Sequence, residues 1–330
     1  MNGGFKIRSA NESDKEQVLK LLNDVFSSQQ RMEYERDNAY WNWKFRDSAY
    51  GPSILTVAEY EAKIIGVDHL WPWEFRYKGE PLKAVQPCDA VVHPDYRGRG
   101  LFKTMRKYGL EEAERQGYQI AFNFPNENSL PGNRSVGAIY LGQISWWVRI
   151  LKPFNLVKNR LFTSEKKDFQ LPGAYNLNIE IIDKLAAQFK VTDEIITIHR
   201  VPGFHHWRYA AHPSRTYGMI DVRDGSKQTI VVFTVNPKGS SREMVVVDMI
   251  GDNSQKTGVV KSIVAAGREM GADFIAVMNN HQFGIKRLWT YRFLKMKSKN
   301  MVVTPINREL NDDVKSMENW SMLAGMHDSI

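Results

Sequence analysis

The sequence predicts a mixed α/β fold, with a mostly antiparallel sheet and flanking helices. Two observations lead to this prediction: short apolar runs at strand spacing, and longer segments with apolar residues at helical spacing. A third is their order, in which several consecutive strands stand between two helices. Strands and helices would alternate one by one in a doubly wound sheet, so the order argues against that architecture.

Local patterns predict each element of the first half. Apolar residues at period two indicate strands, a capping box indicates where a helix begins, and glycine indicates where one stops. In chain order we expect a strand at 5–7, a helix after Ser13-Asp14-Lys15-Glu16, strands at 54–58, 63–67, 73–76 and 82–92, a helix that stops at Gly117, and a strand at 120–122.

The second half of the chain resembles the first. Trp43-Lys44-Phe45-Arg46 corresponds to Trp207-Arg208-Tyr209, 164 residues later (43 to 207). The helix that ends at Gly117 corresponds to one that ends at Gly271, 154 residues later (117 to 271). A shorter loop in the second copy would reduce the offset in this way, because loops tolerate deletion better than helices and strands do. We therefore expect an internal duplication.

The duplication predicts where the domains lie. Residues 1–150 are expected to form the first domain, and residues 179–310 the second. Residues 151–178 contain Lys166-Lys167 and a Pro-Gly pair, which are typical of a connector. Residues 311–330 are polar but carry Trp320, Met322 and Leu323, so this tail is expected to dock on the body.

Composition narrows the class of protein. The 42% hydrophobic content indicates a globular chain, and neither a secretion signal nor a membrane-spanning run is evident. A single cysteine, Cys88, excludes an internal disulfide and fits a reducing compartment, so a cytoplasmic location is expected. The net charge of +8 favours an acidic partner, which could be nucleic acid, anionic lipid or a phosphorylated small molecule.

The segment from Asp89 to Phe102 carries the chemical signal. It contains a strand, a bend with Gly98 and Gly100, and the start of a helix. Glycines let the backbone approach a ligand, and the backbone N–H groups at a helix start attract an anion. This geometry suits a pyrophosphate.

These residues resemble the acyl-CoA loop of the GCN5-related N-acetyltransferases, whose pattern is Gln or Arg, two residues, Gly, one residue, then Gly or Ala. Arg97, Gly100 and Phe102 stand at the three defined places, and Phe102 departs from the small residue usual at the last. The resemblance covers about residues 5–153 and implies two tandem domains of this type. The cofactor-binding residues it implies are Val91, Val92, Arg97, Gly98, Arg99, Gly100, Leu101, Phe102, Asn126 and Ser129.

The resemblance also implies where the co-substrate acetyl-CoA lies. Its pantetheine would pair with the strand at residues 90–92, in a V formed with the strand at 120–124. The second copy has residues 251–256 in place of the loop, with Asp252 and no arginine. That domain is therefore expected to be degenerate and to bind no acyl-CoA.

Three residues are candidates for acid–base catalysis. Tyr140, expected on the helix after the second strand of the V, is the candidate acid for the departing thiolate, by resemblance. Asp89 and His93 lie on or just past the first strand, and either could remove a proton from the acceptor. Helix capping is the alternative role of Asn126 and Ser129. No metal site is expected.

The predicted function is N-acetylation by acetyl-CoA, an acyltransferase reaction. With Trp320 in its tail and Gly325 and Asp328 near its end, the chain resembles tandem acyltransferases of bacterial surface-polysaccharide pathways. This resemblance implies a nucleotide-linked amino sugar as the acceptor. Another amine (an aminoglycoside, polyamine or protein) is an alternative, and so is a non-catalytic module that binds acyl-CoA or nucleic acid. With small molecules as substrates, no nucleic-acid or membrane partner is expected.

Overall fold

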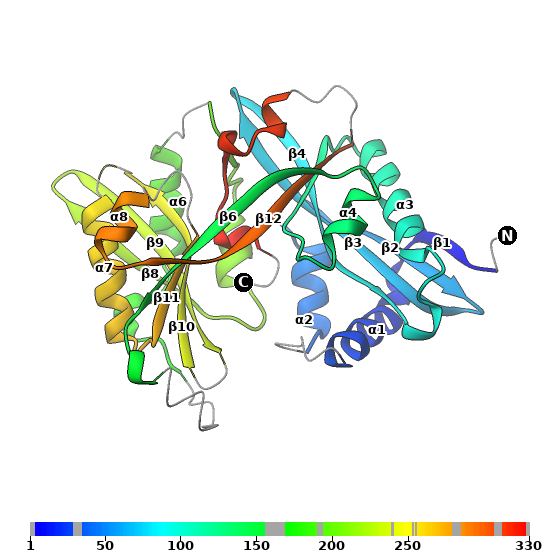
Figure 1. Ribbon diagram of the computed structural model, residues 1–330, viewed down its shortest axis with the longest axis horizontal. Coiled ribbons are helices and arrows are strands. Elements are labelled where there is room, and N and C mark those ends of the chain that lie inside the picture. Colours follow the sequence, from blue (N-terminus) through cyan, green and yellow to red (C-terminus); the bar gives the residue numbers. More distant parts are fainter. Residues whose placement is uncertain are drawn as a thin grey trace. The chain divides into compact units, whose positions relative to one another are not determined.

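The chain passes several times between two units. The computed structural model describes residues 4–28, 35–155, 169–189, 194–238, 241–252, 254, 256–278, 285–306 and 312–327 (Figure 1). Unit 1 comprises Met1–Gly142, Asp193–Trp207 and Asn300–Trp320, and unit 2 comprises Gln143–Thr192, Arg208–Lys299 and Ser321–Ile330.

This division differs from the predicted domains. The expected connector, residues 151–178, belongs to unit 2, and the first change of unit falls at Gly142, inside β6 (Ile139–Ile150). The expected tail is divided between the units, with residues 311–320 in unit 1 and residues 321–330 in unit 2. The physical reason is that β6 and β12 (Leu294–Pro305) each continue from one unit into the other. Lys166-Lys167 and Asp328 lie outside the described residues.

Unit 1 contains a mixed sheet, as predicted. Its strands are β1 (Lys6–Ser9), β2 (Ile54–Tyr60), β3 (Lys63–Tyr77), β4 (Glu80–Val92), β5 (Ile120–Asn123) and the end of β12, in that order across the sheet. Every neighbouring pair is antiparallel except β4 and β5. The short strand β7 (Ile196–Ile198) adds to β3 at Phe75.

The helical segments of unit 1 are η1 (Glu12–Asp14), α1 (Lys15–Ser28), α2 (Asn38–Trp41), η2 (Asn42–Arg46), η3 (Pro94–Tyr96), α3 (Leu101–Arg115) and α4 (Leu130–Arg134). The predicted helix start is shifted slightly. Asn11 is the cap residue, and the Asp14 side chain accepts from the Asn11 N–H, so the capping box begins two residues before Ser13.

Helix α3 packs closely on the sheet and carries the glycine-rich loop at its start (Figure 1). A Cβ on Gly109 would lie 3.2 Å from the Leu70 side chain, so glycine permits this approach. Arg106 of α3 forms two 2.7 Å hydrogen bonds with the buried carboxylate of Asp68 on β3. Bidentate pairs of this kind fix direction as well as distance, so α3 is held in one orientation.

Unit 2 repeats the element order of unit 1. Its strands are the end of β6, β11 (Phe274–Met278), β10 (Ser241–Gly251), β9 (Lys227–Lys238) and β8 (Tyr217–Asp224), in that order across the sheet. Its helices include α6 (Ile179–Gln188), α7 (Lys256–Glu269) and α8 (Ile285–Thr290). The series β8-β9-β10-α7-β11 matches β2-β3-β4-α3-β5, and β10–β11 is parallel, as β4–β5 is.

The two tryptophans of the repeated motif meet inside unit 1. Trp43 lies in η2 and Trp207 in η5 (His206–Ala210), and both segments are five-residue π-helical turns. Trp43 Nε1 donates to the Trp207 carbonyl at 2.7 Å, and Trp207 Nε1 donates to the Trp43 carbonyl at 2.9 Å. This reciprocal pair supports the duplication inferred from the sequence.

Candidate active site

Strands β4 and β5 separate part-way along their length. Their parallel pairing joins Ala84 to Ile120 and Val85 to Ala121. Beyond these positions β4 continues to Val92 and β5 to Asn123. Asp89 has a φ of +45°, and the β3–β4 register shifts beside it, which marks a bulge in β4. Bulges bend a strand, and this one lies on the part of β4 that has left β5.

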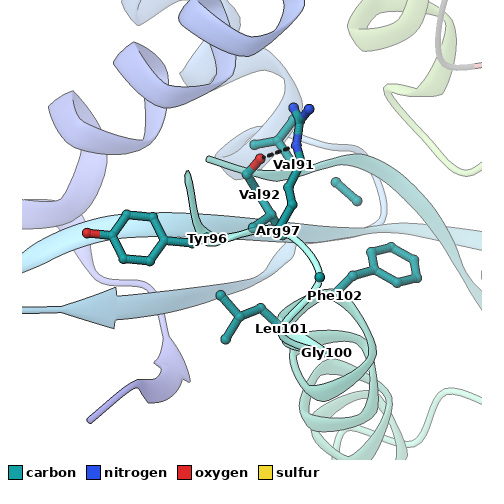
Figure 2. A pocket seen from close by; sticks show the side chains of 9 residues that line it. Val91, Val92, Tyr96, Arg97, Gly100, Leu101 and Phe102 are labelled. Atoms are coloured by element: carbon teal, nitrogen blue, oxygen red, sulfur yellow. Dashed lines mark hydrogen bonds between the residues drawn. The ribbon is translucent and has the colours of Figure 1, made fainter. Parts of the chain in front are cut away.

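The glycine-rich loop and the end of β4 enclose a pocket of about 280 Å³ (Figure 2). Ala90, Val91, Val92, Tyr96, Arg97, Gly98, Gly100, Leu101 and Phe102 line it. Gly98 and Gly100 have φ values of +76° and +75°, and a Cβ on either would meet no atom within 4 Å. Both glycines therefore have a left-handed backbone conformation with open space beside it. This combination would let a ligand approach the backbone closely.

The side chains of the loop divide between the pocket and the protein. Figure 2 shows Arg97 lying back over β4, where its Nε donates to the Val92 carbonyl at 3.1 Å. The Arg99 guanidinium lies 5.3 Å from the Tyr96 ring centre and 5.7 Å from that of Phe5, and it does not line the pocket. Backbone amides, with Arg97 nearby, are thus the groups best placed for a pyrophosphate.

Phe102 departs from the small residue expected at its position, and the structure accommodates it. A Cβ on Gly132 of α4 would lie 3.3 Å from the Phe102 ring, so the glycine leaves room for that ring. Arg106 lies over the same ring at 5.1 Å. The start of α3 is therefore closely packed even with a large residue there.

Asp89 lies in a buried ion-pair network. Its carboxylate contacts Lys44 Nζ at 2.6 Å and Arg36 at 3.2 Å, and it accepts from the Tyr40 hydroxyl at 2.7 Å. Burial acts to raise the pKa of Asp89, but the charges of Lys44 and Arg36 outweigh it and hold that pKa well below its usual value. A carboxylate of this kind is a weak base, and the sequence showed no sign of its partners.

His69, Cys88 and Asp89 place three potential metal ligands within 4.8 Å of one another. Cys88 Sγ lies 3.0 Å from His69 Nδ1, and the other ring nitrogen lies 2.8 Å from the Ser53 hydroxyl. The Lys44 ammonium already neutralises the carboxylate, so an ion-pair network describes this group better than a cation site.

The buried His69 of this cluster predicts that the fold loses stability at acid pH. Burial lowers the pKa of His69 below its usual 6.5, against the hydrogen bond to Asp89, which raises it. The unfolded chain then binds more protons below about pH 6.5, so stability falls as the pH drops through that range. We expect urea unfolding to show that the free energy of unfolding falls by at most about 1.4 kcal/mol per pH unit because of His69. The substitution His69→Gln should remove this pH dependence. An unchanged slope in the variant would contradict this assignment.

Tyr140 and His93 occupy different surroundings from those expected. Tyr140 lies on strand β6, not on a helix, because the helix after β5 is the short α4. Its side chain is half-exposed, with Arg134 over the ring at 5.5 Å. His93 caps η3 by accepting from the Asp95 N–H at 3.4 Å. Neither residue lines the pocket.

Asn126 and Ser129 form a turn before α4. Asn126 Oδ1 accepts from the Ser129 N–H at 2.9 Å and from its hydroxyl at 3.1 Å. Asn133, buried in α4, donates to the Ser129 carbonyl at 2.8 Å. Ser129 is the N-cap residue of α4, but its side chain makes no capping hydrogen bond, and neither Asn126 nor Ser129 lines the pocket.

The corresponding turn of unit 2 lies between β10 and α7. Gly251 has a φ of +115°, and a Cβ there would lie 2.2 Å from the Gln228 carbonyl oxygen. The Asp252 carboxylate accepts from the Ser254 N–H at 2.7 Å. Asn253 and Gln255 lie outside the described residues. Backbone fills the space beside Gly251, in contrast to the open space beside Gly98 and Gly100.

Comparison with known proteins shows which family the segment that carries this site matches. Residues 6–138 match the family model of the acetyltransferase (GNAT) domain. This segment is an acetyltransferase (GNAT) domain. It contains the parted strands and the glycine-rich loop, and the protein that carries it is an acyltransferase. No curated protein matches the chain by sequence.

Solved structures show the same fold at low identity. A GCN5-related N-acetyltransferase from Anabaena variabilis has a TM-score of 0.63 and 14% identity, covering 92% of this chain and 73% of that one. Saccharomyces cerevisiae N-myristoyltransferase with bound myristoyl-CoA has a TM-score of 0.60 and 12% identity, covering 92% and 83%. Eis1 from Mycobacterium abscessus has a TM-score of 0.55 and 13% identity, covering 94% and 76%.

Within the part of the chain that the structure describes, none of the helices has the length and apolar composition that a membrane span requires.

Proposed function

We propose that the protein transfers an acetyl group from acetyl-CoA to an amine. The pocket between the end of β4 and the glycine-rich loop carries this proposal. The open faces of Gly98 and Gly100 would bring backbone N–H groups to the pyrophosphate, where hydrogen bonds to a charged group are each worth about 1.5–3 kcal/mol. Arg97 would add charge, and Leu101 and Phe102 would form the wall at the start of α3.

The edge of β4 beyond Val85 would hold the pantetheine arm. Val91 and Val92 line the pocket, and β4 has left β5 at this level. A strand edge offers N–H and C=O groups to an extended amide chain, which pairs with it as another strand would. The bound co-substrate would supply the activated acyl group.

Aromatic packing where the strands part favours a short acyl group. Trp73 and Phe122 are buried there, with ring centres 6.3 Å apart. Gln86 follows the last paired residue of β4 and is also buried, and its Oε1 has no hydrogen-bond partner within the described part of the chain. Large side chains and an amide at this point suit acetyl better than a long alkyl chain.

Tyr140 is our proposed acid for the departing thiolate. Tyr140→Phe removes only the hydroxyl, so kcat is expected to fall about 100-fold, a typical contribution of a positioned acid, with the KM for acetyl-CoA unchanged. Steady-state kinetics would measure this, with Tyr118→Phe as a control expected to match wild type. An unchanged kcat would leave Tyr140 as a packed aromatic of β6.

His93 and Asp89 differ in how well they could act as the base that takes a proton from the acceptor amine. His93 is half-exposed at the end of β4, whereas Asp89 is ion-paired and buried. We propose His93, directly or through water, as the proton acceptor, and Asp89 as the residue that holds the bulge of β4. Loss of kcat in His93→Gln, restored at raised pH, would support this role.

The acceptor predicted from the sequence, a nucleotide-linked amino sugar, remains a proposal by analogy. Exposed tryptophans would suit such an acceptor, because an indole ring can stack on a sugar or a base. Trp43, Trp71, Trp73, Trp207 and Trp320 are all buried in unit 1, so they serve its core. Another amine therefore remains an alternative acceptor.

Thiol release from acetyl-CoA across a panel of amines tests the function. The panel would contain nucleotide-linked amino sugars, aminoglycosides, polyamines and peptides. Release with one class identifies the acceptor, and release with none, although acetyl-CoA binds, would favour a module that senses acyl-CoA. Failure to bind acetyl-CoA would overturn the proposal.

A further inference from the structure

Charge is distributed unevenly between the two units. Unit 1, which carries the glycine-rich loop, has 22 Lys and Arg against 25 Asp and Glu, a formal charge of −3. Unit 2 has 23 Lys and Arg against 12 Asp and Glu, a formal charge of +11. The basic character of the chain therefore belongs to the unit without the loop, and acyl-CoA binding does not account for it.

Exposed apolar side chains are concentrated in the same unit. Among the described residues, unit 2 has six large exposed hydrophobic side chains: Ile150, Phe154, Phe189, Trp289, Leu294 and Met296. The described part of unit 1 has one, Tyr140. Three of the six fall in one short stretch, residues 289–296, which ends α8 and begins β12. We call residues 289–296 the apolar corner.

The apolar corner has a buried side and an exposed side. Phe293 is fully buried in the core of unit 2 and anchors the stretch. Trp289 is 69% exposed, Leu294 54% and Met296 58%. Packing of the core requires Phe293 but gives no reason for the three exposed side chains, and a large exposed apolar group is the feature that calls for a partner.

Cations surround these side chains. Arg292 and Lys295 are exposed within the corner. Arg149 of β6 donates to the Tyr291 carbonyl at 2.5 Å, so it lies against the corner. Burial and, after it, the positive charges of Arg268 and Arg292 lower the pKa of Arg149. A partner that supplies negative charge would offset these positive charges.

We propose that the apolar corner, together with Arg149 and Arg268, docks peripherally on an anionic lipid surface. Tryptophan, leucine and methionine side chains enter the boundary between headgroups and acyl chains, and arginine and lysine bind the headgroup phosphates. Nucleic acid would use the cations but not the exposed Leu294 and Met296. This proposal is independent of acyl transfer, and it replaces the expectation that no membrane takes part.

Co-sedimentation of the full chain with vesicles tests the proposal. We expect the protein to bind phosphatidylcholine vesicles that contain phosphatidylglycerol, and to bind vesicles of phosphatidylcholine alone at least about tenfold more weakly. Added salt should weaken the binding to the anionic vesicles. Arg292→Glu with Lys295→Glu should abolish binding. Trp289→Ser with Leu294→Ser and Met296→Ser should also abolish it, even at low salt.

Two matched variants serve as controls. Lys63→Glu with Lys83→Glu makes the same change of charge on exposed residues of unit 1, and Phe154→Ser removes an exposed aromatic outside the corner. Both should bind vesicles as wild type does, and thermal unfolding should show that all variants fold. Equal loss in the charge control, or retained binding in the apolar triple variant, would overturn the proposal. Binding to RNA or to polyglutamate but not to vesicles would overturn it as well.

Discussion

Gly100→Trp is expected to abolish acetyl-CoA binding while leaving the protein folded. Gly100 lines the pocket, and the space where its Cβ would stand is open to the ligand. An indole ring there would fill the position proposed for the pyrophosphate, and its Cβ would meet no protein atom within 4 Å. We expect the Kd to rise by about 100-fold or more, since several charge-assisted hydrogen bonds would be lost. Isothermal titration calorimetry with acetyl-CoA measures this directly.

Gly79→Trp is the matched control for this experiment. Gly79 has a φ of +81°, close to the +75° of Gly100, and a Cβ there also meets no atom within 4 Å. It lies in the hairpin turn between β3 and β4, away from the pocket. Both variants should therefore carry the same cost of a left-handed tryptophan, about 1–2 kcal/mol. Only Gly100→Trp should lose acetyl-CoA, and equal affinity in the two variants would refute the loop assignment.

Lys44→Met is expected to destabilise the fold by about 3–5 kcal/mol, because it leaves the buried carboxylate of Asp89 with part of its compensating charge removed. Lys44 and Asp89 are both almost fully buried, and their charged groups lie 2.6 Å apart. The positive φ of Asp89 adds a reason, since the bulge of β4 depends on contacts that hold a strained backbone. Urea unfolding followed by fluorescence gives the free energy.

Two further variants make this prediction specific. Lys20→Met breaks a Lys–Asp pair of almost the same length, 2.7 Å, but on exposed side chains of α1, so it should leave stability within error of wild type. Lys44→Met combined with Asp89→Asn removes both charges of the buried pair and should recover part of the loss. A double variant no more stable than Lys44→Met would mean that packing, and not charge, holds this site together.

Much of the fold follows from local sequence patterns. The strands at 54–58 and 82–92, the helix that begins after the glycine-rich turn, and the strand at 120–122 all occur, with bounds shifted by a few residues. The strands expected separately at 63–67 and 73–76 form one continuous strand, β3. The mixed, mostly antiparallel sheet was predicted for the same reason. These features depend on residues near one another in the chain, so periodicity, capping residues and glycines are sufficient to predict them.

The glycine-rich loop is the part of the candidate site that the sequence determined by itself. A left-handed backbone at Gly98 and Gly100 is a local requirement that few other residues meet. The repeated tryptophan motif was also visible in the sequence, because duplication preserves spacing.

Only the tertiary structure decided the rest. The partners of β6 and β12, the network that joins Asp89 to Lys44 and Arg36, and the place of Tyr140 on a strand all depend on residues far apart in the chain. Hydrophobic pattern predicts that a side chain is buried or exposed, but not which distant group it meets. The sequence therefore determined the elements and the loop, and long-range packing decided their partners, because pairing between distant segments is set by the free energy of the whole core.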